Sequence, residues 1–109
     1  MRSAKIFYKN VYAGILQESD EGYVFIYDEE YLNNEDSEPI SLTLPLSNKT
    51  YFSNVLFPFF DGLIPEGWLL NIAIDKFQYK ENDRMSILLS CCSDCIGAVS
   101  VVLDKKEVL

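Results

Sequence analysis

The spacing of apolar residues changes near the middle of this 109-residue chain, and the change limits the folds that the chain can form. Before about residue 50, apolar residues alternate with polar ones or form short β-branched and aromatic runs, as in strands. Farther along, they recur every three or four residues, as on one face of a helix. The pattern therefore predicts a sheet-forming first half and a helical second half.

Four strands are expected in the first half, at Lys5–Tyr8, Val11–Leu16, Tyr23–Tyr27 and Ile40–Leu46. Only Lys9 and Asn10 separate the first two, which is the length of a tight hairpin turn. The composition of Glu18–Gly22 is typical of a turn before the third strand. An acidic loop from Asp28 to Pro39, with one turn of helix, precedes the fourth strand. Because Pro45 cannot donate to a strand ladder, the fourth strand is expected at an edge or to end there.

Three helices and a last strand are expected in the second half. The first helix has an apolar face of Phe52, Val55, Leu56, Phe59, Phe60 and Leu63, with a break or kink at Pro58. The second starts at Pro65 and carries Trp68, Leu69, Ile72 and Ala73, and the third carries Met85, Leu88, Leu89 and Cys92. Ala98–Leu103 closes the chain as a strand. The expected fold class is α+β, a mainly antiparallel small sheet (a β-meander plus a C-terminal strand) packed with about three short helices.

Length and apolar content indicate one domain that spans residues 1–109, because 49% hydrophobic residues can build one core in a chain too short for two. No apolar run approaches the roughly 18 residues needed to cross a bilayer. The N-terminal residues lack the apolar stretch of a secretion signal. We therefore expect a cytoplasmic protein without a membrane segment.

The charge of the chain disfavours nucleic acid as a direct partner. Seventeen acidic and nine basic residues give a net charge of −8, which repels phosphate backbones. Between Asn10 and Asn48 there is no lysine or arginine, although nine carboxylates fall there. This acidic run is either a solvated loop face or a surface that steers the domain toward a basic partner.

The side chains needed for catalysis or metal binding are largely missing. The chain has no histidine, so the usual general base near neutral pH is absent. Cys91, Cys92 and Cys95 form a single cluster without the second pair of ligands that a structural zinc site needs. No glycine-rich phosphate loop is present. We therefore expect no enzymatic activity, no cofactor and no metal, and we interpret the cysteines as small apolar residues.

The segment Phe57–Trp68 is the most distinctive part of the chain, because it concentrates aromatic residues, two prolines and two glycines around an expected helix-turn-helix. Apolar residues at helical spacing there are typical of a core. Trp68 is the only tryptophan, and tryptophan is often an interface anchor. Both roles, core and interface, stay open for Trp68.

Three parts of the chain resemble the N-terminal domain of HipA-type serine/threonine kinases. They are the segment Ser41–Leu46, the run Phe59–Gly67 and the ending Asp94–Val99, and the resemblance extends over nearly the whole chain. It implies a link to toxin kinases of bacterial toxin–antitoxin systems, which phosphorylate aminoacyl-tRNA synthetases and pair with the DNA-binding antitoxin HipB. The family's ATP-binding, catalytic and metal-binding residues lie downstream of this domain, so none corresponds to a position here.

Without a kinase part, the chain is similar to HipS, the small antitoxin of three-part HipBST systems. This resemblance implies a HipT-like or HipA-like kinase as partner, with a HipB-like protein as a further member of the complex. The residues expected to bind the partner are Phe59, Asp61, Gly62, Ile64, Pro65, Glu66, Gly67 and Trp68. The alternative is an N-terminal structural domain, or a fragment, of a HipA-type kinase.

Overall fold

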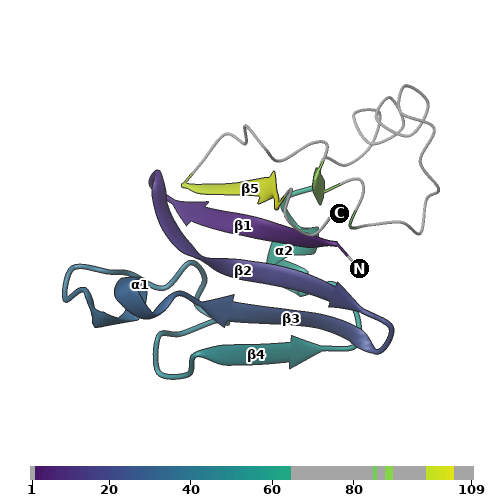
Figure 1. Cartoon of the computed structure of the whole chain (residues 1–109), viewed down its shortest axis with the longest axis horizontal. Helices are drawn as coiled ribbons and strands as arrows, with labels where there is room; N and C mark the ends of the chain where they lie inside the picture. The colour runs from purple at the N-terminus through teal and green to yellow at the C-terminus, as the bar shows by residue number, and fades with distance from the viewer. Residues whose placement is uncertain (1, 65–84, 86–87, 90–97, 105–109) are drawn as a thin grey trace.

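A computed structural model of the chain describes residues 2–64, 85, 88–89 and 98–104. Its centre is a five-stranded antiparallel sheet in the order β4-β3-β2-β1-β5 (Figure 1). The strands are β1 Ser3–Tyr8, β2 Val11–Ser19, β3 Gly22–Tyr27, β4 Thr50–Ser53 and β5 Val99–Leu103, and the described part also contains α1 Glu29–Asn33 and α2 Pro58–Asp61. The expected α+β class with a mainly antiparallel sheet is confirmed.

The hairpin of β1 and β2 forms where the two-residue spacing predicts it. Lys9 and Asn10 have φ angles of 51° and 68°, as a tight turn that matches the right-handed strand twist requires. The Lys9 amide also donates to the Ala98 carbonyl at 2.7 Å, which ties the turn to the start of β5. The third strand and the last strand of the prediction are confirmed as β3 and β5.

The β5 strand, which is the last described strand in the sequence, pairs with β1, which is the first. Its register joins Ala4 to Leu103 and Tyr8 to Val99. The Asp104 amide donates to the Ser3 carbonyl at 2.9 Å, immediately beyond the strand. The beginning of the chain therefore lies inside the sheet, between β2 and β5, and not at its edge.

The prediction of a fourth strand at Ile40–Leu46 is wrong, because this segment is an irregular loop with a turn at its centre. Ile40 and Leu44 are buried, but Leu42 is 96% exposed, so the alternating pattern does not correspond to one buried face. The Tyr27 hydroxyl accepts the Ile40 amide at 3.1 Å and donates to the Leu44 carbonyl. A side chain therefore satisfies backbone groups that a strand ladder would have paired.

The prediction of a helix face that begins at Phe52 is also wrong. Phe52 belongs to β4, where it pairs with Val24 and is 59% exposed, and Val55 is 62% exposed in the loop that follows. The helix begins only at Pro58. Proline lacks an amide hydrogen and fits the first turn, while it favours extended backbone at the residue before it. Phe57 has that conformation, with φ −51° and ψ 134°.

The core lies on the face of the sheet that α2 covers. Phe60 of α2 is fully buried, with its ring centroid 5.7 Å from that of Phe25 in β3, and α2 lies behind the sheet in Figure 1. Met85 and Leu88 have helical backbone and are fully buried, in agreement with the apolar face expected there. The predicted helix that starts at Pro65 lies outside the described residues.

Candidate partner-binding surface

The described half of the predicted binding segment is divided between core and surface. Phe59 is half-buried, with its ring centroid 5.2 Å from that of Phe60. Ile64 is buried in the core cluster, whereas Asp61 is half-buried. Phe59 and Asp61 are therefore partly accessible to a partner. Ile64 instead packs in the core and cannot contact a partner directly.

Gly62 is the C-cap of α2, and there is little space for a side chain at this position. Its amide donates to the Pro58 carbonyl at 2.9 Å, and its φ of −69° is one that any residue adopts. A Cβ atom here would lie 3.2 Å from the Pro58 carbonyl oxygen, so a side chain would press on the last helical turn. The predicted site residues Pro65, Glu66, Gly67 and Trp68 lie outside the described residues, and their role stays a prediction.

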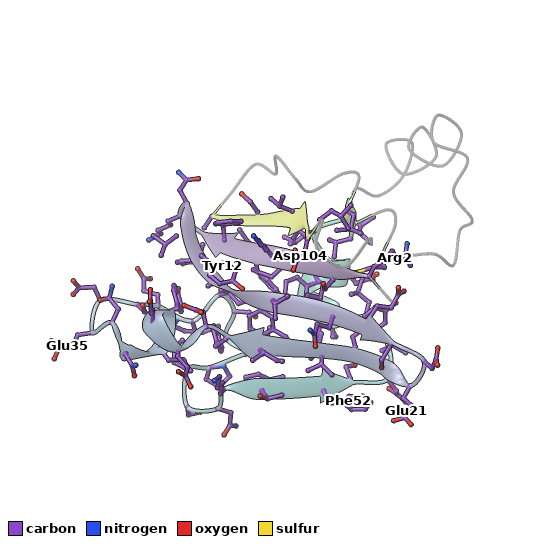
Figure 2. The ribbon with its side chains drawn as sticks, in the orientation of Figure 1. Arg2, Tyr12, Glu21, Glu35, Phe52 and Asp104 are labelled. Atoms are coloured by element: carbon purple, nitrogen blue, oxygen red, sulfur yellow. The ribbon has the colours of Figure 1, made fainter. Side chains whose placement is uncertain are left out.

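The outward face of the sheet is a second candidate surface, which the sequence pattern did not single out. Ala4, Ile6, Leu16, Phe25 and Val101 point to the core, so their strand neighbours point away from it. We call this the outer sheet face, and its apolar residues are Phe7, Tyr12, Ile15, Val24, Ile26, Phe52 and Val102. The face is turned toward the viewer in Figure 2, in which Tyr12 and Phe52 are labelled. It offers a broad apolar area on the side opposite α2.

Strand register brings these side chains into contact distance. One row of paired residues crosses all five strands and consists of Val102, Lys5, Ile15, Ile26 and Thr50. Lys5 is the only charged residue in this row. An antiparallel sheet with one free face normally alternates apolar and polar residues. The apolar run in β3, where successive residues are apolar on both faces, is therefore a sequence signal of an apolar outer sheet face.

A cavity opens on the outer sheet face beside β1. It has a volume of about 470 Å³ and is lined by Lys5, Phe7, Tyr12 and Asp104. The Phe7 and Tyr12 ring centroids are 5.8 Å apart, edge to face. Burial raises the pKa of the Tyr12 phenol, and the Asp28 and Asp104 carboxylates raise it further. The walls of the cavity therefore combine two aromatic rings with one lysine and one carboxylate.

Within the described part of the chain, no group of three or more histidine, cysteine, aspartate or glutamate side chains could hold a metal ion. Cys91, Cys92 and Cys95 lie outside that part. No helix among the residues with a described conformation has the length and apolar character needed to cross a bilayer. What the described surface offers chemically is apolar contact area and carboxylates.

Comparisons with known proteins agree with this geometry. A family model described as the HipA N-terminal domain matches residues 4–102. A solved structure described as the N-terminal domain of HipA toxin superposes with a TM-score of 0.76 at 28% identity, covering 97% of this chain and 95% of that one. An uncharacterized protein from Haemophilus influenzae is 32% identical over 106 residues, which cover 97% of this chain and 96% of the relative.

Proposed function

This chain belongs to the HipA N-terminal domain family, and from that premise we propose that it binds a HipA-type serine/threonine kinase toxin and neutralises it. In this proposal the chain is a HipS-like antitoxin of a bacterial toxin–antitoxin system, and it acts in the cytoplasm on a HipT-like kinase. The observation that carries the proposal is the match over residues 4–102, because it assigns nearly the whole chain to the N-terminal domain and not to the kinase domain.

The relative from Haemophilus influenzae supports a role as a separate protein. The similarity covers 96% of that relative, so the same domain makes up almost all of another protein. A domain that packs on a kinase within one chain can also do so from a separate chain, and its binding can then be lost or regulated. This is the behaviour that an antitoxin needs.

The outer sheet face supports a role in binding a large protein partner. Ile15, Val24 and Ile26 are half-buried apolar residues at its centre, and Phe52 extends the apolar area to the edge strand. Contiguous exposed apolar surface is costly in water and often marks a protein contact site. We therefore assign the outer sheet face to the kinase as a contact surface, in addition to the segment from Phe59 to Trp68.

The proposal includes no catalytic step by this chain. The sequence has no histidine and no phosphate-binding loop, and the matched family region is not the kinase domain. Calorimetric titration of the purified chain with ATP and magnesium is expected to give no saturable heat. Binding in the micromolar range would contradict this part of the proposal.

Co-expression in bacteria tests the function directly. The HipT-like kinase encoded beside this chain should arrest growth when produced alone, and production of both proteins should restore growth. The control is a catalytically inactive kinase, which should not affect growth with or without this chain. Continued arrest while both proteins are soluble would overturn the antitoxin function.

The alternative function, an N-terminal structural domain of a HipA-type kinase, is favoured by the description of the solved structure as part of HipA toxin. The gene distinguishes the two. A stop codon after Leu109 followed by a separate kinase reading frame supports the antitoxin, whereas coding that continues into a kinase supports the structural domain. A HipB-like DNA-binding protein completes the proposed complex, and this acidic chain itself does not contact DNA.

A further inference from the structure

A groove with aromatic walls lies between the β1–β2 turn and α1. Two adjoining cavities of about 170 and 260 Å³ form it, and both are lined by Val11, Tyr31 and Asn34. Tyr8 completes the wall of the first cavity, and Tyr12 that of the second. We call this the hairpin groove; it lies at the end of the sheet where α1 is seen in Figure 1.

The walls of the hairpin groove are apolar and held in place. Val11 is 53% exposed and Tyr12 is 36% exposed, so both present apolar surface to a ligand. The Tyr31 ring stacks on Tyr27 with centroids 5.9 Å apart and planes within 2°. The Tyr31 hydroxyl donates to the Glu38 carbonyl, which fixes the ring from its other end. Tyr31 is only 5% exposed, so it supports the groove from within, and Tyr8, Val11 and Tyr12 present the accessible apolar surface.

The rim of the hairpin groove is acidic. Its lining includes the carboxylates of Asp28, Glu30, Asp36 and Glu38, and Lys9 is the only basic residue among the lining residues. The Asp28 carboxylate accepts the Tyr31 amide at 3.4 Å and so caps α1. Glu30 and Asp36 form no ion pair within the part of the chain that the structure describes. The groove therefore combines apolar walls with available negative charge.

One cation of the chain itself already occupies the mouth of the groove. The Lys9 ammonium lies 5.4 Å from the centroid of the Tyr8 ring and 3.2 Å from the Glu38 carboxylate. The hydrogen bond and charge of Glu38 raise the pKa of Lys9. Both partners are largely exposed, so this ion pair is weak and can be exchanged for another. The site thus shows the contacts that a second cationic side chain would make.

We propose that the hairpin groove binds an arginine- or lysine-containing segment of a partner protein. The methylene stem of the cationic side chain lies along Val11 and the accessible rings of Tyr8 and Tyr12, and its charged head pairs with Glu30 or Asp36. Because Tyr12 also belongs to the outer sheet face, one partner can cover both surfaces. The inference is separate from the proposed function, since it specifies the chemistry of the bound segment and not that the partner is a kinase.

The test is an NMR titration of the full chain with a blocked tetrapeptide of alternating leucine and arginine. Saturable shifts are expected at the groove residues, with none from a peptide in which glutamate replaces arginine. Combining Glu30→Gln with Asp36→Asn should weaken binding roughly fivefold or more, because it removes two rim charges. The matched control combines Asp20→Asn with Glu21→Gln, which changes net charge equally at the opposite end of the sheet (Figure 2). It should weaken binding less than about twofold.

A second pair of variants examines the role of Lys9. Lys9→Met frees the Glu38 carboxylate and the Tyr8 ring, so it should strengthen peptide binding. Lys49→Met is its control, because it also removes one exposed lysine, which pairs with Glu29 at 2.9 Å outside the groove. The proposal would be overturned if each groove variant changed peptide affinity by the same factor as its control. General charge attraction would then explain the changes in affinity. Binding of spermidine to the same residues as tightly as the peptide would also overturn it.

Discussion

Tyr27 holds a loop on the sheet through one hydroxyl group. The ring is fully buried, and the hydroxyl accepts the Ile40 amide at 3.1 Å while it donates to the Leu44 carbonyl. Tyr51 acts on the same loop from β4, where its hydroxyl donates to the Pro45 carbonyl at 2.5 Å. Tyrosine side chains therefore replace the strand ladder that the apolar alternation predicts for this segment.

Tyr27→Phe should lower the free energy of unfolding by about 1–3 kcal/mol, because it leaves two buried backbone groups without their partner. Urea denaturation of the wild type and the variant measures the difference. Tyr51→Phe is the matched control and should cost less than about 1 kcal/mol, since water can replace its exposed hydrogen bond. Equal costs for the two variants would contradict the anchoring role of Tyr27.

Stability should also fall at alkaline pH. Burial raises the pKa of Tyr27 from 10.0 to about 12, so the folded chain holds the phenolic proton more tightly than the unfolded chain does. The resulting stability is fully present below pH 10 and is lost as the pH rises from 10 toward 12. Tyr12 and Tyr31 shift in the same direction. Urea midpoints measured across this range should decline less steeply in Tyr27→Phe, and an unchanged slope would exclude Tyr27 as a cause.

Trp68 is the residue for which core and interface roles differ most in their consequences. As an interface anchor, Trp68→Ala should weaken kinase binding by roughly 2–4 kcal/mol, or about 30-fold to 1000-fold. As a core residue, the same change should cost roughly 3–5 kcal/mol of folding stability. We expect the interface outcome, measured by affinity and melting temperature on one variant. An early-melting variant that still neutralises the kinase at low temperature would assign Trp68 to the core.

At the scale of elements, local signals predicted most of the sheet. The two-residue turn at Lys9 and Asn10, the β-branched and aromatic β3 and the closing β5 are where their patterns indicate. The segment Ile40–Leu46 could not be predicted, because alternation alone does not show that a distant tyrosine satisfies its backbone. Phe52 could not be assigned either, since β4 is short and its apolar residues also fit a helical spacing.

The candidate site was less predictable than the fold. Phe59, Asp61 and Gly62 of the expected segment reach the surface at least in part, but Ile64 is core. The outer sheet face depends on register between strands, and no single stretch of sequence contains it. Its local signals are the apolar runs of β2 and β3.

The boundary between β4 and α2 can be tested with two phenylalanines eight residues apart. Phe60→Ala should cost roughly 3–5 kcal/mol, because it leaves a cavity beside Phe25. Phe52→Ala should cost less than about 1 kcal/mol, since Phe52 is mostly exposed on an edge strand. Chemical denaturation measures both. Similar costs would mean that the two residues share one buried helical face.

The outer sheet face can be tested without disturbing the strands. Threonine keeps the β-branched shape of valine and isoleucine but adds a hydroxyl group. Combining Val24→Thr with Ile26→Thr should therefore weaken kinase binding by about tenfold or more while the far-ultraviolet circular dichroism stays unchanged. Surface plasmon resonance measures the affinity. An unchanged affinity would remove this face from the contact surface.

At the scale of the whole molecule, the described surface offers two different contact areas. The outer sheet face provides the apolar area, and the hairpin groove and the loop after α1 provide carboxylates. With a net charge of −8, the chain should associate faster with a basic partner at low ionic strength. Both properties suit a module whose role is to bind another protein.

Calorimetric titration of the purified chain into the proposed HipT-like kinase tests the binding claim most directly. The expected result is one site per kinase with a dissociation constant below about 1 μM, together with loss of kinase activity at equal concentrations. An inactive kinase variant should bind equally well, since binding needs no catalysis. No binding heat at several temperatures, with both proteins folded and kinase activity unchanged, would contradict the claim.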